Sequence, residues 1–166
     1  MRTKSFIATI AIILALTGCS SSSTSSNGNA GTVTSNGVTV SGSKGQEPVV
    51  TFGSDVYPPT ALMIKDIYIG DGAAAEYSSS VTTHYVGYGL NTKQKFDTSW
   101  GRGEPVTFSL NQVIPGWTQG IPGMKVGGRR LLIIPAGLAY GANPPPGGII
   151  QPNEPLVFVV DLTAVQ

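Results

Sequence analysis

The sequence predicts an α+β fold in which a five- to six-stranded antiparallel sheet curls around one short helix. Two observations lead to this prediction. After Pro48, short apolar runs alternate with Gly and Pro clusters, which is typical of antiparallel strands with short connections. Only residues 112–120 offer a helix, and a sheet with one apolar face buries so short a helix by wrapping around it.

Six segments have the pattern of strands, because their apolar residues either alternate with polar ones or form continuous runs. The expected strands are residues 49–52, 61–69, 80–88, 106–110, 130–134 and 156–162. Pro115 suits the first position of the helix, where its missing N–H costs nothing, and Gly120 suits a C-terminal cap. We therefore expect one folded domain over residues 48–166.

The N-terminus has the features of an export signal. Arg2 and Lys4 precede an apolar stretch of 11 residues, 6–16. This stretch is shorter than the roughly 20 residues of a membrane-spanning helix and fits the apolar region of a signal peptide. We therefore expect the protein to be exported.

The segment "LTGC", residues 16–19, resembles the lipobox of bacterial lipoproteins, in which the cysteine takes a diacylglyceryl group and becomes the new N-terminus. A plain secretory signal is the alternative, but Leu16 and Gly18 make a poor cleavage site of the A-x-A type. Cys19 is the only cysteine, so no internal disulfide can form. We expect residues 1–18 to be a lipoprotein signal peptide and Cys19 to anchor the protein on the extracytoplasmic side of a bacterial membrane.

Residues 19–47 are expected to form the lipidated cysteine and a flexible tether. Ser, Thr, Gly and Asn supply 21 of the 28 residues 20–47, a composition that buries too little apolar surface to offset its ordering entropy. Within it, "TVTSNGVTV", residues 32–40, places Asn-Gly between β-branched residues, which indicates a hairpin. An isolated hairpin is marginally stable in water. It therefore either docks on the domain or stays mostly unfolded, and the sequence leaves both options open.

Composition excludes several classes of function. Without residues 1–18, eight Lys and Arg face nine Asp and Glu, so the protein has no field that attracts nucleic acid. The chain has no G-x-S-x-G, H-E-x-x-H or C-x-x-C motif, and its one histidine, His84, fits a structural role. We expect no metal and no cofactor. Since the sequence has no coiled-coil heptads, we also expect a monomer.

Over roughly residues 58–165 the chain resembles the FKBP-type peptidyl-prolyl isomerases. Seven motifs occur in that family's order and approximate spacing, namely "HYVGY" (84–88), "KFDTSWGRGEP" (95–105), "VIPGW" (113–117), "GMKVGGRR" (123–130), "IPAGLAYG" (134–141), "GGII" (147–150) and "LVFVVDL" (156–162). The resemblance implies an apolar pocket between sheet and helix. Such a pocket catalyses cis/trans rotation about X-Pro bonds and binds macrolides such as tacrolimus.

The resemblance also implies the residues of the site. Asp97, held by Tyr85 and Arg102, would orient the carbonyl of the rotating bond, while the Ile114 N–H and the Tyr140 hydroxyl would hold peptide carbonyls. These residues, apart from Arg102, are the expected catalytic group. The substrate-binding group would be Phe96, Arg102, Val113, Trp117, Ile149, Ile150 and Phe158.

Trp117 would form the floor on which the proline ring rests, with its other face packed on the sheet. The chain departs from the family pattern at three places. Val106 stands where the family usually has an aromatic residue, so one wall of the pocket should be thinner. Two residues fewer than is common separate Leu110 from Val113, and the loop 143–148, "NPPPGG", replaces a segment that often contains a histidine or an aromatic residue.

Three functions fit these features. The first is a lipid-anchored prolyl isomerase that accelerates the folding of exported, proline-containing polypeptides. The second is a lipoprotein that binds proline peptides or acts as a chaperone, with weak or no turnover. The third is a structural surface lipoprotein, which would have no use for a pocket.

Overall fold

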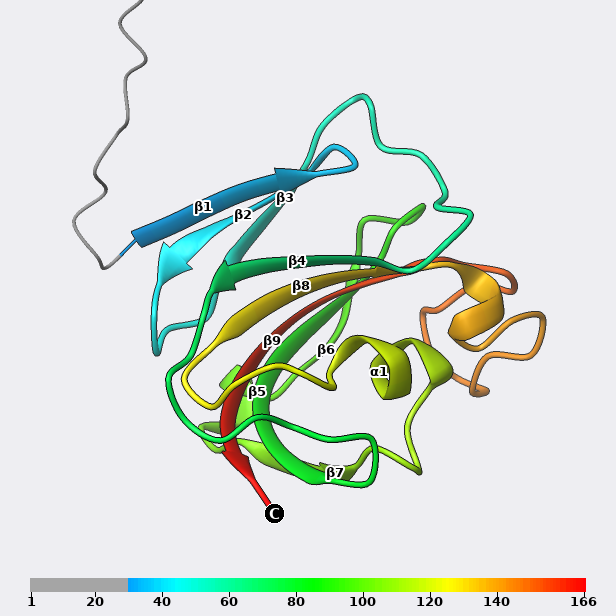
Figure 1. The fold of residues 1–166 in the computed structure, drawn as a ribbon. Coiled ribbons are helices and arrows are strands. Elements are labelled where there is room, and N and C mark those ends of the chain that lie inside the picture. The colour runs from blue at the N-terminus through cyan, green and yellow to red at the C-terminus, as the bar shows by residue number, and fades with distance from the viewer. Residues whose placement is uncertain (1–29) are drawn as a thin grey trace, which may run out of the picture.

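The computed structural model describes residues 30–166 and contains two antiparallel sheets and one α-helix (Figure 1). The expected signal peptide, Cys19 and residues 20–29 lie outside the described residues. No helix within 30–166 is long and apolar enough to span a membrane. The strands are β1 (Ala30–Ser35), β2 (Val38–Ser43), β3 (Val49–Phe52), β4 (Met63–Tyr68), β5 (Ser80–Gly89), β6 (Lys95–Thr98), β7 (Val106–Ser109), β8 (Arg129–Ile134) and β9 (Leu156–Val165). The helical segments are α1 (Pro115–Gly120) and the 3-10 turns η1 (Trp100–Arg102) and η2 (Ala136–Leu138).

The main sheet has the strand order β4-β8-β9-β5-β6, and β7 pairs with a second segment of β5. The long strands β5 and β9 form its centre, with a register that runs from Val81 opposite Val165 to Gly89 opposite Leu156. All six expected strands are present, with each bound within three residues of its expected position. The predicted fold class, a six-stranded antiparallel sheet with one short helix, is confirmed.

Helix α1 lies against strand β8. Pro115 occupies its first turn as expected, but Gly120 is the last helical residue and Ile121 takes the capping position, so the predicted role of Gly120 as a cap is wrong. The glycines serve close packing instead. A Cβ on Gly116 would lie 2.4 Å from Ile134 Cγ2, and one on Gly120 would lie 2.8 Å from Leu132 Cδ2. Because neither glycine has a side chain, the helix can approach the sheet closely.

Strands β1, β2 and β3 form a second sheet, in the order β1-β2-β3. Asn36 and Gly37 both have positive φ values, 50° and 69°, as a two-residue hairpin turn with the right-handed twist requires. The predicted hairpin is confirmed. Residues 30–43, however, are not part of a flexible tether. The folded part of the chain includes both strands of this hairpin, because they pack on the main domain, and the boundary expected at residue 48 is wrong.

The main sheet is covered on both faces, as Figure 1 shows. On its concave face, which holds α1, the buried core includes Trp117, Leu132, Ile134 and Phe158. On the opposite face, Val38 and Val40 of β2 are fully buried in a cluster with Leu131, Ile133, Val157 and Val159. Every residue of β8 is buried for this reason.

Polar contacts also fasten the second sheet to the main sheet. The Tyr68 hydroxyl donates to the Gly42 carbonyl at 2.8 Å and accepts the N–H of Gly31. Arg129, with 1% of its side chain exposed, forms a two-point ion pair with Asp161 at 2.6 and 2.7 Å. Its Nη2 also donates to the Gln46 carbonyl at 2.6 Å. The segment before β3 is therefore fixed to a buried side chain of the main sheet.

Candidate active site

A cavity of about 390 Å³ opens between the concave face of the main sheet and α1. Its volume falls within the range of small-molecule sites in proteins. Side chains from four strands, α1 and the flanking loops enclose it. Its lining consists of Tyr85, Phe96, Asp97, Phe108, Gln112, Val113, Ile114, Trp117, Tyr140 and Phe158.

The cavity wall is mainly aromatic, and the rings brace one another edge to face. Trp117 lies 5.3 Å from Phe158, 5.4 Å from Phe108 and 5.7 Å from Tyr85, measured between ring centroids. Phe96 packs on Phe158 at 5.5 Å. Such edge-to-face pairs are favourable beyond their buried area and hold the rings in place. The cavity is therefore apolar and preformed.

Trp117 belongs to the buried core and also lines the cavity. Only 4% of it is exposed, and it belongs to the cluster that packs α1 on the sheet. The exposed remainder lines the cavity. Its Nε1–H is buried and has no hydrogen-bond partner within residues 30–166. The indole thus offers an apolar surface and one unused donor.

A bulge in β6 places two neighbouring residues at the cavity. Lys95 pairs with Tyr88 and Asp97 pairs with Gly87, so Phe96 is the extra residue of the strand. In a regular strand, neighbours point to opposite faces, whereas a bulge can redirect them. Phe96 and Asp97 accordingly both line the cavity. Gly87 gives them room, since a Cβ there would lie 2.6 Å from Phe96 Cζ.

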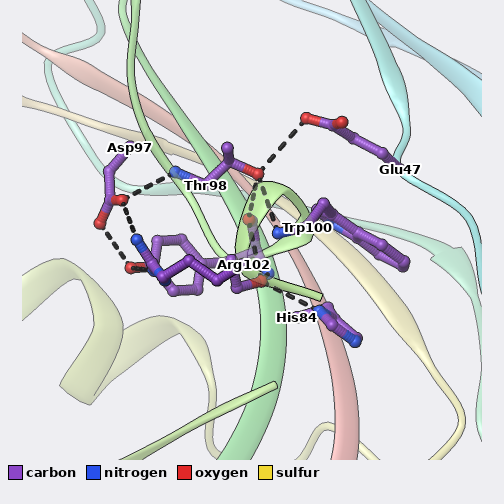
Figure 2. A network of polar contacts seen from close by, with 8 residues as sticks. Glu47, His84, Asp97, Thr98, Trp100 and Arg102 are labelled. Carbon is purple, nitrogen blue, oxygen red and sulfur yellow. Dashed lines mark hydrogen bonds and ion pairs between the residues drawn. The ribbon is translucent and has the colours of Figure 1, made fainter. Parts of the chain in front are cut away.

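Tyr85, Asp97 and Arg102 form the polar edge of the cavity. The Tyr85 hydroxyl donates to Asp97 Oδ2 at 2.5 Å, and the Thr98 N–H donates to Asp97 Oδ1 at 2.8 Å. Arg102 donates through Nη1 to Asp97 Oδ1 and through Nη2 to the Tyr85 hydroxyl, both at 2.9 Å. Figure 2 shows Asp97 and Arg102 pointing toward each other from β6 and η1.

These contacts set the charge of the group. Burial alone would raise the pKa of Asp97, but the hydrogen bonds from Tyr85 and Arg102 and the Arg102 charge outweigh it and hold the pKa below its ordinary value of 3.8. Burial and the hydrogen bond to Asp97 raise the pKa of Tyr85 to about 12. At neutral pH, therefore, Asp97 is a carboxylate and Tyr85 keeps its proton.

Two hydrogen-bond donors at the rim are unengaged. The Ile114 carbonyl accepts the N–H groups of Trp117 and Thr118, whereas the Ile114 N–H, just ahead of the helix, has no acceptor within residues 30–166. The Tyr140 hydroxyl likewise makes no hydrogen bond within that range, and 37% of Tyr140 is exposed. Burial and the Asp97 charge raise the pKa of Tyr140, so its hydroxyl stays protonated. Both groups can donate to a ligand.

The structure brings together eight of the residues expected at the site, which are Tyr85, Phe96, Asp97, Val113, Ile114, Trp117, Tyr140 and Phe158. Arg102 does not line the cavity but holds two residues that do. Ile149 is 42% exposed and Ile150 packs against the core, so neither lines the cavity in this structure. Their assignment to substrate binding stays a prediction.

Two lining residues were missed by the sequence reasoning. Phe108, on β7, contacts both Tyr85 and Trp117, so the wall expected to be thin at Val106 is filled from two residues further along. The alternation of β7 was a usable signal, since residues 106 and 108 share a face. Gln112 lies in the shortened loop, where nothing in the sequence indicated its position.

His84 lies on the opposite face of β5 from Tyr85. Its Nδ1 is 3.0 Å from Ser99 Oγ, and its ring stacks on Trp100 at 4.1 Å. Ser99 Oγ in turn accepts the Tyr85 N–H at 2.8 Å. His84 is therefore not part of the cavity, and its contacts are those of a structural residue.

Comparisons with known proteins agree on the family. A family model described as FKBP-type peptidyl-prolyl cis-trans isomerase matches residues 72–163. The FK506-binding protein of Streptomyces anulatus is 56% identical over 110 residues, which are 65% of this chain and 89% of that protein. The crystal structure of FkpA from Escherichia coli superposes with a TM-score of 0.59 and 44% identity, over 64% of this chain and 49% of that one.

The crystal structure of AtFKBP13 superposes with a TM-score of 0.58 and 34% identity, over 66% of this chain and 96% of that one. The family model covers more than half of the chain, and the cavity lies within the matched residues. The chain therefore belongs to the FKBP-type peptidyl-prolyl cis-trans isomerases and is an enzyme of that activity.

Proposed function

We propose that this enzyme is exported, anchored to a bacterial membrane through a lipid on Cys19, and accelerates the folding of exported polypeptides that contain X-Pro bonds. The charged N-terminus, the apolar stretch 6–16 and the lipobox-like "LTGC" support the location. Two or three acyl chains would hold the protein firmly, whereas one would anchor it only marginally. As a monomer it would act near the membrane on chains that emerge there.

The observation that carries the proposed mechanism is a preformed aromatic cavity beside unengaged donors. Rotation about a peptide bond costs about 18 to 20 kcal/mol because the twisted amide loses resonance. A millionfold acceleration needs only about 8 kcal/mol of differential stabilisation. The planar amide is more dipolar and better hydrated than the twisted one. A cavity that excludes water therefore raises the free energy of the ground state more than that of the transition state.

In this mechanism the proline ring rests on Trp117, with Phe96 and Phe158 beside it. The Ile114 N–H and the Tyr140 hydroxyl hold two carbonyls of the bound chain and fix its orientation. A cavity shaped for the twisted amide adds to the effect, since only interactions that are stronger in the transition state accelerate rotation.

Asp97 orients the rotating carbonyl and transfers no proton. Its lowered pKa keeps it ionised, and a carboxylate favours the electropositive carbonyl carbon while it repels the carbonyl oxygen. Arg102 and Tyr85 hold the carboxylate in one position, each through a different carboxylate oxygen. Macrolides such as tacrolimus, which present an apolar ring and carbonyl oxygens, would bind in the same cavity and inhibit the enzyme.

Location and activity can be tested separately. In bacteria that express the full chain, the wild type should fractionate with membranes, and Cys19→Ala should release it or block its processing. Recovery of Cys19→Ala in the membrane fraction at the wild-type level, and cleaved to the size of the processed wild type, would contradict the anchor. Activity is tested by cis/trans exchange in a proline tetrapeptide. Binding without acceleration would favour a peptide-binding or chaperone role instead.

A further inference from the structure

Glu47 contacts the β6 strand from outside the cavity. Its Oε1 lies 2.8 Å from Lys95 Nζ and 3.3 Å from Thr98 Oγ1. Lys95 and Thr98 are the first and last residues of β6, and the two cavity residues Phe96 and Asp97 lie between them. One carboxylate oxygen therefore contacts both ends of the bulged strand, on the side away from the cavity.

Thr98 connects this contact to the carboxylate of Asp97. While its hydroxyl donates to Glu47, its backbone N–H donates to Asp97 Oδ1 at 2.8 Å. The Thr98 hydroxyl also lies 3.2 Å from the Tyr85 carbonyl and accepts the Trp100 N–H at 3.2 Å. Figure 2 shows Glu47, Thr98 and Asp97 as consecutive members of this network. A shift of Thr98 would therefore change the position of the Asp97 carboxylate.

Glu47 itself has a fixed backbone. The carbonyl of the preceding residue, Gln46, accepts a hydrogen bond from the buried Arg129, and the following residue, Pro48, is buried. A residue before proline is also restricted to extended conformations. An exposed ion pair is usually weakened by the conformational entropy that its residues lose when the pair forms. Because the backbone of Glu47 is already fixed, part of this loss has occurred before the contact forms. Glu47 lies in the loop between β2 and β3 and outside residues 72–163, so this contact comes from outside the part of the chain that matches the family model.

We propose that Glu47 is a positioning residue for isomerisation, which holds the bulged strand β6 so that Asp97 faces the substrate. This rests on the proposed role of Asp97. Loss of an exposed pair of this kind corresponds to about a two- to fivefold change in an equilibrium or rate. Because Asp97 acts on the rotating bond, we expect Glu47→Ala to lower kcat by that factor and to leave KM unchanged.

The test compares full-length variants in detergent, with cis/trans exchange of a proline tetrapeptide as the readout. Glu47→Ala should lower kcat two- to fivefold, and Glu47→Gln should lower it less because its amide oxygen still accepts from Thr98. The matched control is Glu76→Ala, since Glu76 is exposed and its carboxylate makes no hydrogen bond or ion pair within residues 30–166. Amide signals of Asp97 and Thr98 should shift in Glu47→Ala and not in Glu76→Ala.

The decisive comparison is the double variant Glu47→Ala/Asp97→Ala. If Glu47 acts through Asp97, its removal changes nothing further once Asp97 is absent. A Glu47→Ala rate equal to that of Glu76→Ala, or a Glu47 effect that persists in full without Asp97, would overturn the inference. A normal rate for Asp97→Ala alone would instead contradict the role of Asp97. Glu47→Gln keeps the test valid if the alanine variant does not fold.

Discussion

The Tyr85 hydroxyl and the Asp97 carboxylate lie 2.5 Å apart, and Arg102 donates a hydrogen bond to each of them. The three residues come from β5, β6 and η1, so the pair is fixed by separate parts of the fold. The arrangement keeps a negative charge at the edge of an aromatic cavity. It also leaves no group at the site that exchanges a proton near neutral pH.

Asp97→Ala should lower kcat/KM for a proline tetrapeptide about tenfold, because it removes an electrostatic contribution and leaves the apolar cavity in place. Asp97→Asn should lower it less, since its amide oxygen can still accept from Tyr85. Exchange NMR measures both rates, and thermal unfolding checks that both variants fold. Complete loss of activity would indicate proton transfer and contradict the mechanism.

Tyr85 should titrate well above an ordinary tyrosine, at about pH 12. The tyrosinate absorbance of the wild type minus that of Tyr85→Phe isolates this one group among the six tyrosines. A raised pKa in the folded state contributes stability that is present below pH 10 and is lost as pH rises through about 12. A difference titration centred near pH 10 would show that neither the burial of this hydroxyl nor its contact with Asp97 persists in solution.

Asp97 has the opposite pH dependence. Its pKa is lowered, so its contribution to stability is present above the ordinary value of 3.8 and is lost as pH falls through the lower pKa of the folded state. The free energy of unfolding, plotted against pH, should therefore have different slopes for wild type and Asp97→Asn only in the acid range around and below pH 3.8. A difference that grows between pH 5 and neutral pH would contradict this assignment.

Gly116→Ala should destabilise the protein by about 1 to 3 kcal/mol, because the added methyl group meets Ile134 at 2.4 Å in a packed core. Gly137→Ala is the control, since nothing lies within 4 Å of a Cβ there. Denaturant unfolding gives both free energies. Equal stabilities would mean that α1 does not pack on β8 as closely as described.

Asp161→Ala should cost about 3 to 5 kcal/mol, because it leaves the Arg129 charge buried without its partner. It should also loosen the second sheet, which Arg129 holds through the Gln46 carbonyl. Asp66→Ala breaks a similar pair with Arg130, but 38% of the Asp66 side chain is exposed, so the loss should be smaller. The opposite order of the two losses would be inconsistent with this packing.

The strand pattern predicted most of the fold because periodicity and Gly-Pro punctuation are local signals. The second sheet was harder to predict. Its hairpin turn at Asn36-Gly37 was recognisable, but docking depends on what lies across the interface. The continuous apolar run of β8 was the overlooked signal, since a strand that is apolar on both faces needs cover on both.

The site was predicted by resemblance, and its geometry required the structure. The bulge that turns both Phe96 and Asp97 to the cavity depends on the pairing of β5 with β6, and the short, mostly polar β6 gave no periodic signal. Phe108 was missed for a different reason, because the alternation of β7, which places residues 106 and 108 on one face, was not used. The loop that carries Ile149 and Ile150 is rich in Pro and Gly, and such composition does not determine where a side chain points.

The most direct test of the account is exchange NMR of a proline tetrapeptide with residues 30–166, using Trp100→Phe so that Trp117 is the only tryptophan. We expect faster cis/trans exchange, contacts between the proline ring and the indole of Trp117, and loss of both when tacrolimus is added. Acceleration without any contact to Trp117, or acceleration that persists at saturating tacrolimus, would contradict catalysis in this cavity.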